Sequence, residues 1–153
     1  MLQALAVSPA ALDTGFISPP EHKPVSPQLV RQAAVDLVAG NQLSQAYALV
    51  EDAVSQHPDS QELVSMLALI SEARQDWDQA SVHLERLVRL QGSKVTAETL
   101  NHWVRVLRCQ GLVERAARLA ANALKLYPGH VMLESESQTL RSILAVKSDQ
   151  AGA

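Results

Sequence analysis

Aromatic residues are scarce in this chain of 153 residues, where Phe, Trp and Tyr together make up 3%. The core must therefore be built from Ala, Leu and Val, whose small or branched side chains suit closely packed helices. A single cysteine, Cys109, excludes an intramolecular disulfide and fits a reducing compartment. No apolar run approaches the ~20 residues that a membrane-spanning helix needs. No lysine or arginine precedes the apolar start of the chain, which argues against a secretory signal. We expect a cytoplasmic protein without an integral membrane segment.

A strong excess of one charge is also missing. The formal net charge is −3, which gives no general reason to expect binding to nucleic acid or to a membrane surface. The charge is nevertheless uneven along the chain. Residues 27–60 hold one arginine and four acidic residues, whereas residues 97–130 hold five basic and two acidic residues.

Motifs that carry chemistry are absent from the sequence as well. None of the five histidines has a partner at the spacing of a zinc site, and the six glycines are too scattered to form a phosphate-binding loop. His102 and Cys109 would lie two turns apart on one helix, about 10 Å by helical rise, which is too far for an activated thiol pair. We predict a protein that is not an enzyme and that binds no metal and no cofactor.

What the sequence does contain is one pattern in three copies. Ala46, Ala80 and Ala116 follow one another at 34 and 36 residues, and each is followed by apolar residues four and seven positions later. The copies end at Pro58, Gly92 and Pro128. A period near 34 residues is typical of a solenoid in which each unit is a helix-turn-helix hairpin. We therefore predict an all-α fold, an α-hairpin solenoid.

Turn and capping signals divide the chain. Five of the seven prolines lie between Pro9 and Pro27, which predicts a flexible arm before the first hairpin. Asp59 is the predicted N-cap of the second hairpin, and a last amphipathic helix would cover the open apolar edge of the stack. The predicted divisions are an arm at 1–26, hairpins at 27–60, 61–93 and 97–130, a capping helix at 131–147 and a disordered tail at 148–153.

The repeat resembles the tetratricopeptide repeat (TPR) family, and a generic stack of α-hairpins is the alternative. The resemblance covers about residues 27–130. It departs from the family pattern where Ser71 replaces an apolar residue and where the family's glycine and tyrosine of the first helix are missing. The matching positions are Val30, Ala33, Ala34, Leu37, Ala46, Val50, Ala53 and Pro58; Val64, Leu67, Ala68, Ser71, Ala80, Leu84, Leu87 and Gly92; and Leu100, Trp103, Val104, Leu107, Ala116, Ala120, Ala123 and Pro128.

The resemblance implies a concave groove lined by the first helix of each hairpin, in which a protein or peptide partner binds. Val35 and Leu69 occupy positions where members that clamp a terminal carboxylate have asparagine, so we do not expect that mode of binding. Arg31, Arg105 and Arg108 could instead meet an acidic residue of the partner. The candidate groove residues are Gln28, Arg31, Val35, Val38, Glu62, Ser65, Leu69, Glu72, Glu98, Asn101, Arg105 and Arg108, with Ala39, Ala73 and Cys109 beside them.

The two tryptophans carry separate expectations. Trp103 lies at a core position of the repeat, which predicts that it is buried. Trp77 follows the predicted cap Asp76, and we expect it to pack across the hairpin turn; an exposed anchor for a partner is the alternative.

These observations predict a non-enzymatic interaction adaptor or chaperone. The composition, rich in Ala, Leu and Gln and poor in Lys, looks bacterial. The resemblance then implies a role in secretion, pilus or envelope assembly. The alternative is an accessory or regulatory subunit of an enzyme complex, such as a polysaccharide synthase or a glycosyltransferase. The oligomeric state stays open.

Overall fold

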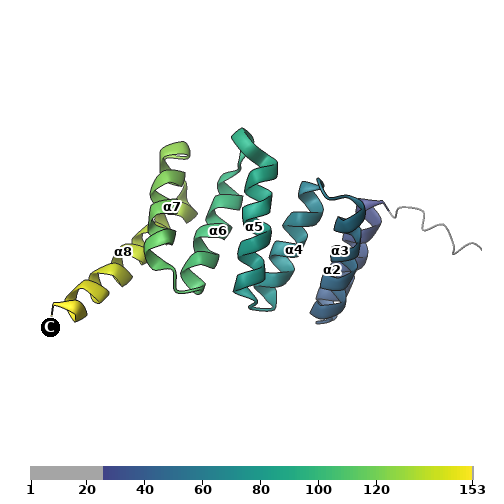
Figure 1. Cartoon of the computed structure of the whole chain (residues 1–153), viewed down its shortest axis with the longest axis horizontal. Helices are drawn as coiled ribbons and strands as arrows, with labels where there is room; N and C mark the ends of the chain where they lie inside the picture. The colour runs from purple at the N-terminus through teal and green to yellow at the C-terminus, as the bar shows by residue number, and fades with distance from the viewer. Residues whose placement is uncertain (1–25, 153) are drawn as a thin grey trace, which may run out of the picture.

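A computed structural model describes residues 26–152, and in that part of the chain every regular element is helical. The elements pair into three antiparallel hairpins in a row, followed by one longer helix that projects from the end of the row (Figure 1). They are α2 (Pro27–Ala39) with α3 (Leu43–Gln56), α4 (Gln61–Ala73) with α5 (Trp77–Gln91), the 3-10 turn η2 (Gly92–Lys94), α6 (Ala97–Cys109) with α7 (Val113–Leu126), and α8 (Val131–Ala151). The predicted all-α hairpin solenoid with a C-terminal helix is confirmed.

The ends of the chain differ from the prediction in one respect. Helix α8 continues to Ala151, four residues past the predicted end at Lys147, so residues 148–151 are helical rather than a disordered tail. The reason is local, because no glycine or proline interrupts the helix before Gly152. The predicted arm, apart from Ser26, lies outside the described residues.

Side-chain caps begin the first helix of each hairpin at equivalent positions. The hydroxyl of Ser26 accepts a hydrogen bond from the backbone N–H of Leu29 at 3.4 Å, and Ser60 accepts one from Leu63 at 3.3 Å. Thr96 does the same for the third hairpin. The cap of the second hairpin is thus Ser60 and not Asp59, because Ser60 directly precedes the first residue of α4, Gln61, and its side chain makes the capping hydrogen bond.

The turn inside each hairpin repeats the same backbone motif. Asn41, Gln75 and Gly111 have positive φ values of 58°, 58° and 81°. The residue after each of them donates its N–H to a carbonyl five residues earlier; in the second turn the N–H of Asp76 reaches the carbonyl of Ser71 at 2.9 Å. This is the Schellman arrangement that ends a helix. The three hairpins thus share the same kind of turn between their two helices.

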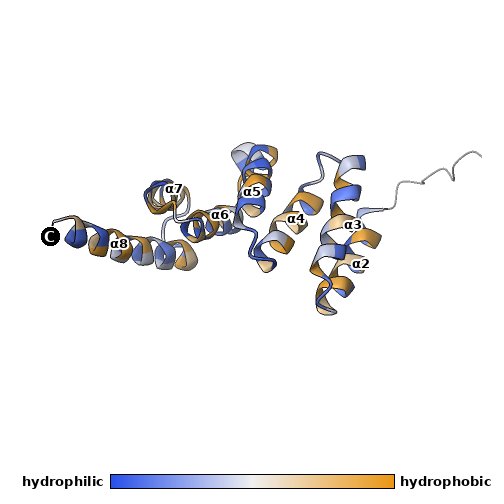
Figure 2. Cartoon of the chain, turned by 60° about the horizontal axis from the view of Figure 1, so that its bottom comes forward, coloured by the Kyte–Doolittle hydropathy of each residue, from blue (hydrophilic) through white to orange (hydrophobic). Residues whose placement is uncertain are grey.

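The core lies between the helices, and every helix in Figure 2 has both hydrophilic and hydrophobic residues along its length. Ala46, Ala80 and Ala116 are completely buried, as the repeat requires where two helices of a hairpin approach closely. One apolar cluster joins the first two hairpins and a second joins α6, α7 and α8. Leu133 and Leu140 of α8 are fully buried in the second cluster, so α8 covers the last hairpin.

The structure explains how Ser71 fits a core position of the repeat, and it shows how far the two tryptophans are buried. Ser71 is fully buried, and its hydroxyl donates to the carbonyl of Leu67 at 2.7 Å, so the polar group costs little in an apolar site. Trp103 is only partly buried, which corrects the prediction. Its ring lies between the two apolar clusters, and the guanidinium of Arg115 lies over it at 5.9 Å from the ring centre. Trp77 is partly buried against the first cluster, as expected.

Candidate binding groove

Three of the large, exposed apolar residues of the first two hairpins line one groove between α2 and α4, whereas Leu29 and Val82 lie outside it. The groove has a volume of about 510 Å³, within the range of ~300–1,000 Å³ that ligand sites usually have. Val35, Val38 and Leu69 are 51%, 39% and 48% exposed although they are large and apolar. The lining residues are Arg31, Ala34, Val35, Val38, Glu62, Ser65, Met66, Leu69, Ile70 and Ala73.

The groove exists because of the helix spacing set by the repeat. Each hairpin packs its second helix between two first helices, which leaves α2 and α4 in lighter contact with each other than with α3. The core buries other residues of the two helices, namely Val30 and Ala34 of α2 and Leu63, Val64 and Leu67 of α4. Val35, Val38 and Leu69 remain uncovered and line the groove.

A second, smaller cleft of about 210 Å³ lies on the other side of α4, between it and α6. Leu69 and Ser65 line both hollows, so α4 forms a ridge between them. Leu84 and Leu87 of α5 contribute apolar lining, while Thr96, Glu98 and His102 add polar groups. The concave face is therefore apolar at its first end and becomes polar toward the third hairpin.

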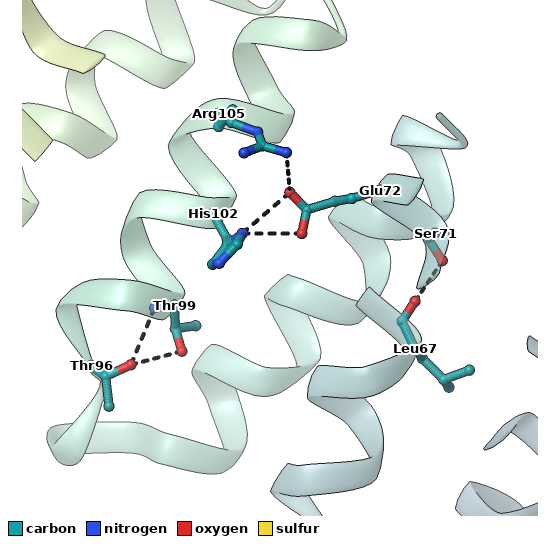
Figure 3. Close-up of polar contacts among 7 residues, drawn as sticks. All are labelled: Leu67, Ser71, Glu72, Thr96, Thr99, His102 and Arg105. Atoms are coloured by element: carbon teal, nitrogen blue, oxygen red, sulfur yellow. Dashed lines mark hydrogen bonds and ion pairs between the residues drawn. The ribbon is translucent and has the colours of Figure 1, made fainter. Parts of the chain in front are cut away.

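A buried carboxylate connects the second hairpin to the third (Figure 3). Glu72 of α4 is buried, and its side chain points toward His102 and Arg105 of α6. Nδ1 of His102 lies 3.3 Å from Oε1 in hydrogen-bond geometry, and 3.1 Å from Oε2 in an ionic contact. A guanidinium nitrogen of Arg105 lies 3.4 Å from Oε1. The hydrogen bond to Glu72 raises the pKa of His102 above its ordinary value, against the opposing effect of burial.

The neighbouring interfaces along the concave face each have an ion pair of their own. Arg31 of α2 lies 3.3 Å from Glu62 of α4. Arg108 of α6 donates two hydrogen bonds, of 2.8 and 3.1 Å, to Glu136 of α8. The hydrogen bonds to Glu136 raise the pKa of Arg108 above its ordinary value. Together with Glu72, these pairs link α2, α4, α6 and α8 in order.

The structure brings together half of the predicted groove residues and separates the rest. Of the twelve candidates, the six that line the α2–α4 groove are Arg31, Val35, Val38, Glu62, Ser65 and Leu69. Glu98 lines the second cleft, and Glu72 and Arg105 belong to the buried cluster with His102. Arg108 pairs with Glu136. Gln28 is exposed outside the groove, and Asn101 is partly buried.

Sequence reasoning missed Met66, His102 and Glu136. Glu136 belongs to the capping helix, which follows the three repeats and therefore has no repeat position assigned to it. A signal was present, because Arg31–Glu62, Glu72–His102 and Arg108–Glu136 are separated by 31, 30 and 28 residues, close to one repeat. Within residues 26–152, no group of three or more His, Cys, Asp or Glu side chains could hold a metal ion. In the same range no helix is both long and apolar enough to cross a bilayer.

Comparisons with solved structures establish the fold. No protein-family model and no curated protein matches the chain. The second TPR domain of human RPAP3, solved with the HSP70 peptide SGPTIEEVD, superposes with a TM-score of 0.65 at 13% identity, over 73% of this chain and 92% of that one. The first TPR of Spaghetti (RPAP3), bound to the HSP90 peptide SRMEEVD, gives 0.68 at 14% identity, over 77% of this chain and 92% of that one.

An O-GlcNAc transferase from Thermobaculum terrenum is similar as well, with a TM-score of 0.60 at 20% identity. The match covers 74% of this chain and only 21% of that enzyme. At these identities the likeness concerns the fold alone. The chain has the fold of a tetratricopeptide repeat domain, as the repeat pattern predicts.

Proposed function

We propose that this protein is an interaction module that binds a segment of a partner protein in the α2–α4 groove. The observation that carries the proposal is the exposure of Val35, Val38 and Leu69 on two adjacent helices, around a groove of about 510 Å³. Uncovered apolar groups that gather in one hollow mark binding sites, because scattered ones need no explanation whereas contiguous ones do. The two RPAP3 TPR domains named above were solved with bound peptides, which supports the same use of this fold.

The finer proposal is a non-enzymatic adaptor or chaperone in bacterial secretion, pilus or envelope assembly. Such a protein would hold a segment of a secreted or assembling subunit until that subunit reaches its place. A solenoid suits this work because it presents a long surface rather than an enclosed pocket. The proposal takes the partner to be a protein and not nucleic acid.

The second candidate is an accessory or regulatory part of a glycosyltransferase or polysaccharide synthase. It is favoured by the likeness to the O-GlcNAc transferase, in which the matching region is a small share of a longer enzyme. In this case the groove would bind the enzyme or its protein substrate.

Site-specific photocrosslinking in cells tests the proposed function and separates the two candidates. A photoreactive amino acid at Leu69 is expected to give one dominant adduct, whose mass-spectrometric identity names the partner. The same group at Val82, which is 56% exposed on α5 and outside the groove, is the control. Equal adducts at both positions, or none at Leu69, would contradict the proposal. An adduct with a glycosyltransferase would favour the second candidate.

A further inference from the structure

The arginines of the concave face already have carboxylate partners inside the protein. Arg31 pairs with Glu62, Arg105 with Glu72, and Arg108 with Glu136. The last pair is a fork of two hydrogen bonds between side chains that are 29% and 14% exposed. The three concave helices, α2, α4 and α6, contain no lysine that could take over the role.

An acidic ligand would therefore compete with a carboxylate of the protein for each of these arginines. To reach Arg108, it would have to displace Glu136 from a two-bonded geometry that is difficult to improve. It would also approach Glu98, which is exposed beside the cleft. Like charges repel over such distances, and this repulsion discriminates against an acidic partner.

The apolar groove offers the opposite environment. Val35, Val38 and Leu69 are exposed, and Met66 and Ala73 extend the same surface. The side chains of Val35 and Leu69 carry no hydrogen-bond donor, so this part of the groove cannot hold the carboxylate of an acidic ligand. Met66 is unbranched and can adapt to differently shaped aliphatic groups.

We propose that the α2–α4 groove selects an uncharged aliphatic segment of its partner and does not recognise an acidic C-terminus. The proposal rests on the function proposed above and names the ligand class of the same site. The ligand inserts large aliphatic side chains between Val35 and Leu69, and the Arg31–Glu62 pair remains intact at the rim. This class differs from the acidic peptides SGPTIEEVD and SRMEEVD bound by the similar domains.

The test uses the full chain and two fluorescent probes in anisotropy titrations. One probe is the peptide SGPTIEEVD; the other is a twelve-residue peptide with blocked ends, leucine at helical spacing and otherwise Ser and Gln. We expect the aliphatic probe to bind at least tenfold more tightly than the acidic one. Its affinity is expected to change less than twofold between low and high salt, because no ion pair forms on binding. Tighter binding of the acidic probe, or no binding of the aliphatic probe, would overturn the proposal.

Three variants sharpen the test. Leu69→Asp is expected to weaken binding of the aliphatic probe at least tenfold, whereas Val82→Asp, a matched change on α5, is expected to leave it unchanged. Glu136→Gln frees Arg108 and is expected to increase the affinity for the acidic probe severalfold without affecting the aliphatic one. Equal losses in the two Asp variants, or no gain in Glu136→Gln, would contradict the proposal. A groove adduct in the crosslinking experiment together with failure here would refute only the ligand class, whereas no adduct would refute the function.

Discussion

At the scale of single residues, several buried or partly buried polar side chains form hydrogen bonds and ion pairs between neighbouring hairpins. His102 and His83 illustrate this, because the same residue type has opposite environments in the two places. His102 hydrogen-bonds to a buried carboxylate, whereas His83 is itself buried and its Nε2 lies 2.9 Å from the hydroxyl of Tyr47. Burial lowers the pKa of His83, and the hydrogen bond to Glu72 raises the pKa of His102. As the pH falls, protonation of His102 therefore stabilises the folded protein, whereas protonation of His83 destabilises it.

His102→Gln is expected to destabilise the protein more at pH 6 than at pH 9. Because the folded pKa of His102 is raised, its ion pair stabilises the fold fully below the ordinary pKa of about 6.5. That stabilisation is lost as the pH rises through the folded value. The difference in melting temperature between the parent and the variant, followed by circular dichroism across this range, checks the sign.

His83→Gln is the contrasting variant. The pKa of His83 is lowered, so the parent loses stability as the pH falls below about 6.5, where the unfolded chain takes up the proton first. The variant lacks this loss, and its melting temperature is expected to fall less than that of the parent between pH 7 and pH 5. The same pH dependence in both variants would show that these contacts do not control the response.

Ala80→Leu tests the close approach of helices at the repeat alanine. Ala80 is fully buried where α4 and α5 pack together, so a larger side chain must displace its neighbours. We expect a loss of about 1–3 kcal/mol in the free energy of unfolding, measured by urea denaturation. Ala33→Leu, on the exposed face of α2, is the control and is expected to change little. An unchanged midpoint in Ala80→Leu would mean that the alanine position tolerates larger residues.

At the scale of elements, the first helix of each hairpin is followed by a residue in the left-handed region. Local signals located the helices well, since the helix predicted from about Leu43 to Gln56 has those bounds in the structure. The turns are less uniform in sequence than in structure. Gln75 adopts a φ of 58° that favours glycine, while Gly111 occupies the equivalent place in the third hairpin.

Gln75→Gly is expected to stabilise the protein by up to about 1 kcal/mol. A residue with a Cβ in the left-handed region costs roughly 1–2 kcal/mol, part of which the greater freedom of glycine in the unfolded chain offsets. Gly111→Ala is expected to have the opposite sign. No atom lies within 4 Å of the added Cβ, so the cost there is purely conformational. Denaturation midpoints of the two variants check the pair, and equal signs would refute this account.

At the scale of the whole molecule, each hairpin is stabilised by the elements packed beside it. Each element packs mainly on its neighbours in sequence, as expected for a repeat protein. Helix α8 closes the stack by burying Leu133 and Leu140 against the third hairpin. Its position gives the last hairpin a partner that it would otherwise lack.

Leu140→Ala is expected to loosen the C-terminal end of the solenoid selectively. A cavity at a fully buried leucine costs about 2–5 kcal/mol. Because contacts are local, amide hydrogen exchange is expected to speed up in α6, α7 and α8 and to remain slow in α3 and α4. Val146→Ala, at an exposed site on the same helix, is the control. Uniform acceleration along the chain would indicate one fully cooperative unit.

The repeat period and the buried alanines could be read from the sequence, because each depends on residues within one hairpin, whereas the cap of the second hairpin was predicted one residue too early. The fold class followed from them, and the apolar side of the groove followed from the resemblance to the TPR family, which places Val35, Val38 and Leu69 on the concave face. The carboxylate partners of the arginines could not be predicted from the sequence. Whether Arg108 is available to a ligand depends on Glu136, which lies on another helix and reaches it only after α8 has packed against α6. Ion pairing depends on distances of a few ångströms between side chains far apart in the chain, and these distances arise only when the hairpins stack.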